Sequence, residues 1–376
     1  MVAGETSGDM LGAALIAALR RHAPDCEIRG IGGTQMQAAG MQIDYPASRL
    51  AVRGYWEVLR HLPGLLAIRR SIRHTMLTWR PDVFVGIDAP DFNLDLEASL
   101  REAGVRTVHY VSPSIWAWRM ERLSKIKSAV DHMLLVFPFE REIYAEAGIP
   151  ATYVGHPLAD AIELAPDQSA ARRALGFADD ATLIALLPGS RESELSYMAP
   201  LFLEATERLL RQHGDWQFVL PLANDEVAQL WRERFKDAVT RLPLKVLSGD
   251  ARGAMTAANA VLVASGTATL EAALLKRPMV ISYRVSALSY RLMWRQRRLP
   301  YVGLPNILAQ SFVVPELLQD EATPERLANA IETLLADSAA QQKLDRVFTD
   351  MHWALKQNSA ERAAEVVREI ARKNHG

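Results

Sequence analysis

The chain has 376 residues, 49% of them hydrophobic and 23% charged, so it can bury two cores and is neither disordered nor fibrous. Its 43 Lys and Arg against 44 Asp and Glu give a net charge of −1, which argues against a general nucleic-acid binder. The one cysteine, Cys26, excludes a disulfide scaffold, a cysteine zinc site and an iron–sulfur cluster. No apolar run approaches the roughly 18 residues of a membrane span, and Met1–Glu5 lacks the features of a signal peptide, so we expect a cytoplasmic protein.

Short apolar runs alternate with amphipathic stretches along most of the chain, which is typical of parallel βα units. The predicted strands of the first half are 82–88, 105–111, 133–137 and one near 153. A polar passage at 166–169 reads as a linker, and the pattern then restarts. The predicted strands of the second half are 183–187, 217–220, 245–247, 261–264 and 279–283.

These elements predict an α/β protein of two Rossmann-like, doubly wound domains that face each other across a cleft. The first domain is expected over residues 1–165 and the second over 166–340. A C-terminal helix at about 340–376 is expected to pack back on the first domain.

The net charge of the whole chain is close to zero, but two stretches of it are strongly basic. Residues 53–80 hold six Arg and one acid, and residues 284–298 hold five Arg and no acid. The first stretch also carries large apolar side chains: Trp56, Val58, Leu59, Leu62, Leu65 and Leu66. It is either an amphipathic helix packed on its own domain or an interfacial patch that inserts among anionic lipid headgroups.

Polar residues directly after strands of a parallel sheet are candidate ligand contacts. Gly189, Ser190 and Arg191 follow the strand at 183–187 and offer close backbone approach, a hydroxyl and a cation. This combination suits a diphosphate, which the arginine would face.

A second such turn, Ser265, Gly266 and Thr267, leads from the strand at 261–264 into a helix. The unpaired N–H groups and positive dipole of a helix start suit a phosphate. Glu271 lies one turn further on, where a carboxylate can hold the two hydroxyls of a ribose. The plain alternative is that the hydroxyls cap the helix and Glu271 is solvated.

The chain carries neither a G-x-G-x-x-G dinucleotide fingerprint nor a P-loop, and it has no D-x-D pair for a metal-dependent sugar transferase. We therefore expect no metal and no cofactor, and a helix dipole with an arginine would neutralise the phosphates.

The first half supplies carboxylates at predicted strand ends. Asp88 follows an apolar strand, and Glu5 lies in a glycine-rich turn; either could act as a general base. Either Asp91 or Asn93 is expected to cap the next helix, and His109 is expected to be a satisfied core histidine.

Several motifs of the chain resemble those of the lipid-A-disaccharide synthase family. They are Ala3–Asp9, Val85–Asn93, Tyr110–Arg119, Leu187–Arg191, Ala264–Thr267 with Glu271, and Leu304–Asn306. Together they span nearly the whole chain in the family's order.

The resemblance implies a GT-B glycosyltransferase that works without metal. It implies condensation of UDP-2,3-diacylglucosamine with 2,3-diacylglucosamine 1-phosphate to lipid A disaccharide 1-phosphate and UDP, with inversion at the anomeric carbon. The first domain would bind the acceptor and face the cytoplasmic side of the inner membrane, and the second would bind the UDP-sugar. The enzyme would associate with that membrane peripherally.

Carried over by position, the resemblance marks Asp88 and Arg191 as functionally important and places Glu271 and Asn306 in the nucleotide site. It also makes the segment from Trp56 to Leu66 the membrane contact. Members usually carry about ten further residues before the equivalent of Val2, which form most of the first strand, so that strand is expected to be short here. Residues 309–314 depart from the family pattern, so no acceptor-phosphate contact is assigned there.

Other enzymes with this architecture are the alternatives. A peptidoglycan N-acetylglucosaminyltransferase also works at the membrane, but its glycine-rich motifs differ. A UDP-GlcNAc 2-epimerase would share the UDP site but needs no basic apolar patch.

Overall fold

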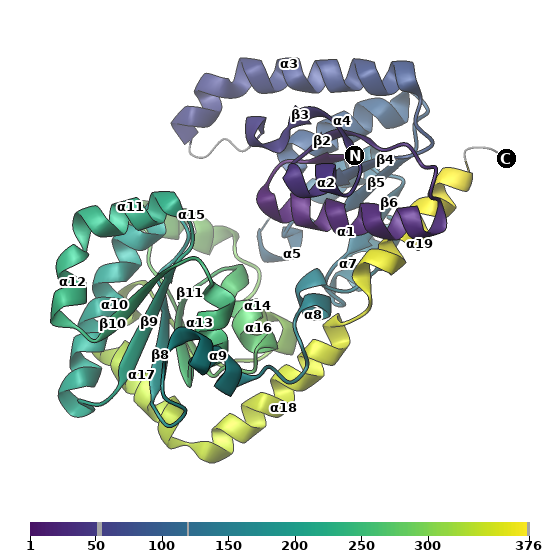
Figure 1. The fold of residues 1–376 in the computed structure, drawn as a ribbon. Coiled ribbons are helices and arrows are strands. Elements are labelled where there is room, and N and C mark those ends of the chain that lie inside the picture. Colours follow the sequence, from purple (N-terminus) through teal and green to yellow (C-terminus); the bar gives the residue numbers. More distant parts are fainter. Residues whose placement is uncertain (51–54, 119, 374–376) are drawn as a thin grey trace. The chain divides into compact units, whose positions relative to one another are not determined.

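The computed structural model describes residues 1–50, 55–118 and 120–373, with side chains described except at 55–61, 118, 239–240, 288, 292–293 and 296. The chain divides into two compact units, each built on a parallel sheet (Figure 1). Unit 1 comprises Met1–Asp160 and Ala354–Gly376, and unit 2 comprises Ala161–Trp353. No helix among the described residues is both long and apolar enough to span a membrane.

Unit 1 contains a seven-stranded sheet in the order β3-β2-β1-β4-β5-β6-β7, in which every pair of neighbours is parallel. Its strands are β1 Val2–Ala3, β2 Arg29–Gly32, β3 Gln42–Pro46, β4 Phe84–Ile87, β5 Thr107–Tyr110, β6 His132–Leu135 and β7 Ala151–Tyr153. The central strands β4 and β5 are buried along their whole length, as expected of a parallel sheet covered on both faces.

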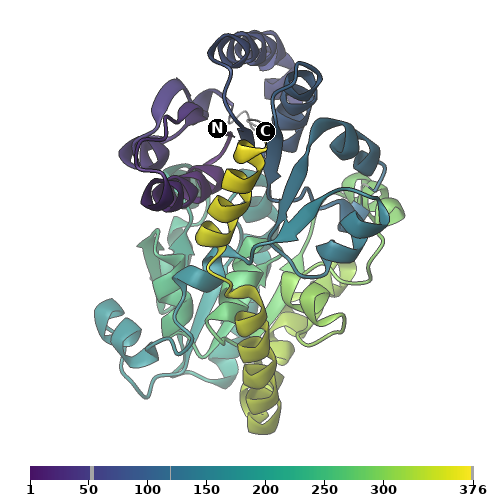
Figure 2. The same ribbon diagram turned by 90° about the vertical axis from the view of Figure 1, so that its right-hand side faces the viewer.

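Helices cover both faces of this sheet (Figure 1). They are α1 Thr6–His22, α2 Thr34–Ala38, α3 Tyr55–Trp79, α4 Pro90–Glu102, α5 Ile115–Trp118, α6 Arg122–Ala129, α7 Glu140–Glu146, α8 Pro157–Ala161, which crosses into unit 2, and α19 Ser359–Arg372. On one face, Ile72 of α3 and Leu96 of α4 pack with Phe84 of β4 in one core cluster. On the other face α19 lies beside α1, where Glu361 pairs with both Arg21 and His22 (Figures 1 and 2).

Unit 2 contains a six-stranded parallel sheet in the order β10-β9-β8-β11-β12-β13. Its strands are β8 Leu183–Leu187, β9 Gln217–Leu222, β10 Leu244–Ser248, β11 Ala260–Ala264, β12 Met279–Tyr283 and β13 Glu316–Leu318. Its helices are α9 Gln168–Leu175, α10 Glu192–Gln212, α11 Asp225–Arg234, α12 Lys236–Arg241, α13 Ala251–Ala257, α14 Thr267–Leu274, α15 Ala287–Gln296, α16 Leu304–Ala309, α17 Pro324–Ala336 and α18 Ser338–Leu355. Leu186, Phe202 and Ile331 bring β8, α10 and α17 into one core cluster.

The structure confirms the two-sheet α/β class and differs from the sequence reading in detail. Strands β2, β3 and β13 were not predicted, because they are short, polar or glycine-containing. The helix expected at 340–376 is two helices, and only α19 packs on unit 1, whereas nearly all of α18 belongs to unit 2. The expected linker at 166–169 instead begins α9, where the Asp167 carboxylate accepts a hydrogen bond from the Ala170 N–H.

Candidate active site

The strand orders of both sheets reverse direction at one point. In unit 1 the reversal lies between β1 and β4, and in unit 2 between β8 and β11. In open parallel sheets, ligands bind beyond the carboxyl ends of the strands at such a switch point. Glu5 and Asp88 follow the two central strands of unit 1, and the Gly189 and Ser265 turns follow those of unit 2. The sequence-predicted residues thus gather at the switch point of each sheet.

The Glu5 and Asp88 turns of unit 1 lie side by side because Gly4 lets them approach. A Cβ on Gly4 would stand 2.8 Å from the Cβ of Ala89, closer than two such carbons can lie. Glu5 is exposed at the N-cap position of α1, and its side chain does not cap the helix. Asp88 is half-buried.

The backbone at these strand ends is strained. Asp88 and Ala89 both adopt left-handed conformations, with φ of 52° and 45°, and Val111 after β5 has a φ of 77°. Left-handed conformation costs a non-glycine residue roughly 1–2 kcal/mol, and more is expected for a β-branched one. Such strain persists where the surroundings enforce it and clusters at functional sites.

The predicted caps of α4 are wrong. The helix begins after Ala89 with no side-chain cap, because Pro90 and the left-handed turn already set its start. Asp91 is exposed and pairs with Arg122 at 2.7 Å. Asn93 is fully buried and donates to backbone carbonyls of the strand ends. His109 is a core histidine as predicted, but only its Nδ1 is satisfied: it lies 2.8 Å from Oε1 of buried Glu97, whereas Nε2 has no hydrogen-bond partner among the described residues.

The ends of β5, β6 and β7 carry a buried acid that the sequence analysis missed. Glu140 accepts hydrogen bonds from the Trp116 indole (3.1 Å) and the Phe137 N–H (3.1 Å). Burial raises the pKa of its carboxyl to about 7, and burial lowers the pKa of nearby His156 to about 4. The ring of Phe137 contacts those of both Trp116 and His156. The only sequence signal was an acid among aromatics after a strand.

In unit 2, the turn after β8 is built around Glu194. Gly189 has a φ of 123°, and a Cβ there would stand 2.4 Å from the Cβ of Glu194. The Glu194 carboxylate accepts from the Ser190 N–H (2.9 Å) and from Arg191 Nη1 (2.8 Å). Arg191 nevertheless keeps 69% of its side chain exposed. The guanidinium is therefore oriented by its neighbour and accessible to an anion.

The turn after β11 presents an open helix start. Gly266 is the N-cap of α14, no side chain caps this end, and a Cβ on Gly266 would meet open space. The hydroxyl of Ser265 donates to the carbonyl of Val302, while Thr267 is exposed. Uncapped N–H groups at a helix start form an anion site.

Glu271 and Asn306 both have hydrogen-bond partners within unit 2, and only Asn306 is left without capacity for a nucleotide. One carboxylate oxygen of Glu271 accepts from Nε of Arg252 (2.8 Å), a cation that the sequence analysis did not single out. Asn306 is fully buried, and its amide donates to the Val314 carbonyl and Glu316 while its oxygen accepts from the N–H groups of Val313 and Val314. An asparagine side chain has four hydrogen-bonding positions, so none is left for a nucleotide. Asn306 organises the surrounding loop.

The apolar basic segment lies at the start of α3. Leu62 is 42% exposed, whereas Leu65 and Leu66 are half-buried and Ile68 is buried. Trp56, Val58 and Leu59 lie outside the residues whose side chains the structure describes. Arg69 pairs with Asp95 at 2.6 Å, while Arg70 and Arg73 are exposed.

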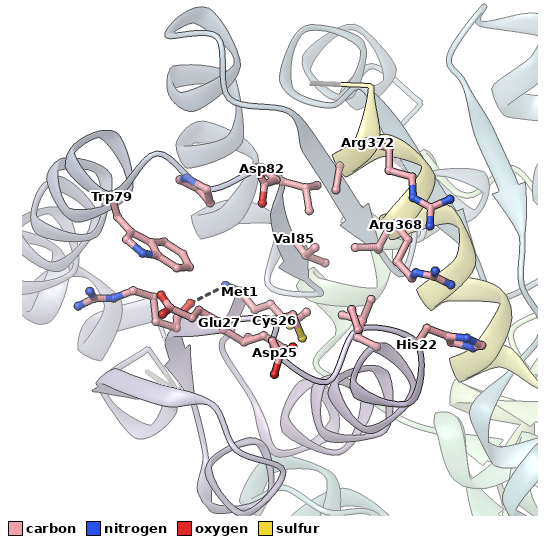
Figure 3. Close-up of a pocket in the computed structure, with 18 of the residues that line it drawn as sticks. Met1, His22, Asp25, Cys26, Glu27, Trp79, Asp82, Val85, Arg368 and Arg372 are labelled. Carbon is pink, nitrogen blue, oxygen red and sulfur yellow. Dashed lines mark hydrogen bonds between the residues drawn. The ribbon is translucent and has the colours of Figure 1, made fainter. Parts of the chain in front are cut away.

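A cavity of about 610 Å³ lies at the opposite end of the unit 1 sheet (Figure 3). Asp25, Trp79, Asp82 and Arg372 line it beside Met1, at the amino ends of the central strands. Because ligands of open parallel sheets gather at the carboxyl ends, this cavity is separate from the candidate site.

Comparison with known proteins decides among the enzymes that share this fold. A family model described as lipid-A-disaccharide synthetase matches residues 1–371. The chain belongs to the lipid-A-disaccharide synthase family. The lipid-A-disaccharide synthase of Chromobacterium violaceum is 55% identical over 99% of this chain and 97% of its own length. That of Paraburkholderia phytofirmans is 53% identical over 100% of this chain and 97% of its own. As a lipid-A-disaccharide synthase, the chain is a bacterial glycosyltransferase of lipid A biosynthesis.

Solved structures show the same fold at low identity, which supports the GT-B architecture of the synthase. The calicheamicin glycosyltransferase CalG4 aligns with a TM-score of 0.60 at 16% identity, covering 98% of this chain and 95% of its own. A UDP-GlcNAc 2-epimerase from Neisseria meningitidis, bound to UDP-GlcNAc, aligns with a TM-score of 0.62 at 12% identity over 97% of both chains. The epimerase alternative therefore shares the fold, and the family match favours the synthase.

Proposed function

We propose that the chain transfers 2,3-diacylglucosamine from its UDP derivative to the 6-hydroxyl of 2,3-diacylglucosamine 1-phosphate, giving lipid A disaccharide 1-phosphate and UDP. The observation that supports the proposal is that the two switch points present different and complementary chemical groups. One presents carboxylates on a strained backbone, and the other presents an open helix start beside an exposed arginine.

The UDP-sugar binds unit 2 in this proposal. The start of α14 and the guanidinium of Arg191 hold the diphosphate, and Gly189 and Gly266 allow the backbone to approach it. Glu271 holds the ribose hydroxyls with the carboxylate oxygen that Arg252 does not engage. UDP-GlcNAc bound to a structure of this fold supports a UDP-sugar as ligand.

The acceptor binds unit 1, where Asp88 is the general base and Glu5 the alternative. The acceptor 6-hydroxyl oxygen attacks the anomeric carbon of the donor from the face opposite the leaving group, so the configuration inverts. The bond from that carbon to the diphosphate oxygen breaks, and its electron pair leaves with UDP. The carboxylate of Asp88 takes the hydroxyl proton. Arg191 and the α14 start stabilise the charge on the departing diphosphate.

The acyl chains of both substrates require a lipid surface, and the start of α3 supplies the contact. Exposed Leu62 would enter the acyl boundary while exposed Arg70 and Arg73 meet anionic headgroups. Arg69 contributes less because Asp95 already neutralises it. The enzyme then works peripherally at the cytoplasmic face of the inner membrane.

The test is to incubate the purified protein with both lipids in mixed micelles and follow UDP release, with the linkage of the product determined by NMR. We expect UDP only when donor and acceptor are both present, a β-linked product, and unchanged activity in EDTA. UDP release without acceptor, or conversion of UDP-GlcNAc to its 2-epimer, would contradict the proposal.

A further inference from the structure

The end of β4 is held by a buried amide that the reaction above does not use. Asn93, one turn into α4, has no exposed surface, and its Nδ2 lies 2.8 Å from the Asp88 carbonyl oxygen. The same nitrogen is 3.2 Å from the carbonyl of Val2 in β1 and 3.4 Å from that of Ile87 in β4. One side chain therefore ties together the two strands that lead into the candidate carboxylates.

The contacts of Asn93 are all made by its nitrogen. Its Oδ1 has no hydrogen-bond partner among the described residues, although it is buried. An aspartate here would place a carboxylate against three carbonyl oxygens. The position therefore needs a neutral donor.

The turn that Asn93 holds would not adopt its shape unaided. Two successive non-glycine residues, Asp88 and Ala89, are left-handed, and Ala89 precedes Pro90. Apart from the Asn93 amide, the turn is held by hydrogen bonds from the Asp88 N–H to the Tyr110 carbonyl (2.9 Å) and from the Phe92 and Asn93 N–H groups to the Ala89 carbonyl (3.0 Å each). Loss of the amide removes the partner of the Asp88 carbonyl and lets the turn relax.

Gly86 and the buried pair of Glu97 and His109 fix the position of the helix that carries Asn93. A Cβ on Gly86 of β4 would lie 2.0 Å from Oε1 of Glu97 and 3.1 Å from the Cβ of Asn93, so only glycine lets this face of α4 reach the sheet. Glu97 in turn bonds His109, the residue of β5 directly opposite Gly86. Helix α4 is thereby locked under the end of β4.

We propose that Asn93 is a positioning residue: its buried amide joins the ends of β1 and β4 and fixes where the Asp88 carboxylate stands beside the Glu5 turn. The inference rests on the proposed role of Asp88 as general base. Asn93 itself touches no substrate.

A double-mutant cycle tests the proposal. We expect Asn93→Ala to lower kcat about 10-fold or more, with the KM of each substrate changed by less than about 3-fold, because the base is misplaced while the binding surfaces remain. In the Asp88→Asn background the same change is expected to cost nothing further, since no base remains to be positioned. Asn93→Ser, which retains one donor, should fall between.

Controls separate positioning from stability. Thr107→Val removes a buried hydrogen bond to Ala129 at the other end of β5, so it should lower the melting temperature without changing kcat well below the transition. If Asn93→Ser, measured as folded protein, lowers only the melting temperature, or if the kcat losses of Asn93→Ala and Asp88→Asn multiply, the positioning role is overturned. If Asp88→Asn alone keeps near-normal kcat, the base assignment itself fails, and the positioning role fails with it.

Discussion

The two switch points lie in sheets with the same order of central strands, but the turns at them are built differently. In unit 1 the chain leaves β4 through a strained left-handed turn, held by the buried Asn93. In unit 2 the chain leaves β11 through Gly266, whose surroundings are open, and enters a helix whose start is uncapped. The proposed roles account for this difference, because a base must be held at one place, whereas an anion is bound by backbone groups that a helix start already aligns. The first edge therefore shows strain and buried polar contacts, and the second shows glycine and open N–H groups.

The substitution Asp88→Asn tests most directly whether the two switch points have different roles. The change keeps the shape and removes the base, so we expect kcat to fall about 100-fold or more. UDP affinity, which we propose resides in unit 2, should remain nearly intact by calorimetry. Near-normal turnover would make Asp88 structural and direct attention to Glu5.

Glu271→Ala addresses the other edge. Loss of a hydrogen bond to a charged group should weaken UDP binding by roughly 1–3 kcal/mol in calorimetry. Glu207→Ala is the matched control, because it removes a carboxylate that pairs with Arg241 elsewhere on unit 2. Unchanged UDP affinity in Glu271→Ala would remove this residue from the site.

Sequence reasoning located both edges but not their internal contacts. Asp88 and Arg191 were found because they lie in the turns after apolar strands, a local signal. The role of Asn93 was misassigned to a helix cap, since its partner Val2 is 91 positions away in the chain. Asn306 was likewise expected to contact the nucleotide, and its saturation by Val313, Val314 and Glu316 is visible only in three dimensions. Contacts between segments that are far apart in the chain leave no pattern in the local sequence, so sequence reasoning does not find them.

Substitutions in α3 test the proposed lipid contact separately from catalysis at the two switch points. Replacing Leu62, Leu65 and Leu66 with serine should lower binding to anionic vesicles about 10-fold, because apolar burial drives insertion, and high salt should weaken what remains. Phe312→Ser, which removes an exposed apolar side chain of unit 2, is expected to leave vesicle binding unchanged. Loss of the thermal transition in the triple variant would show that these leucines are core.

The smallest expected effect concerns Glu140. Because burial raises its pKa to about 7 from 4.5, the folded state keeps the proton that the unfolded state has lost, and stability falls as the pH rises from about 4.5 to about 7. His156, with its pKa lowered to about 4, acts in the opposite sense, so stability rises from about pH 4 to about 6.5.

Glu140→Gln removes the first contribution and leaves the second. Relative to the unaltered protein, we expect the variant to gain about 1 kcal/mol of unfolding free energy between about pH 6 and pH 8. Urea unfolding at both pH values measures this. A constant difference between the two proteins would show that Glu140 is ionised throughout.

The return of the chain to unit 1 through α19 has a consequence for how the protein is made. Unit 2 occupies one continuous stretch, whereas unit 1 needs Ala354–Gly376, which are synthesised after unit 2. During translation, unit 2 can therefore complete its fold while the face of α1 that α19 later covers is still exposed. Of the two units, unit 1 is therefore begun before unit 2 and completed after it.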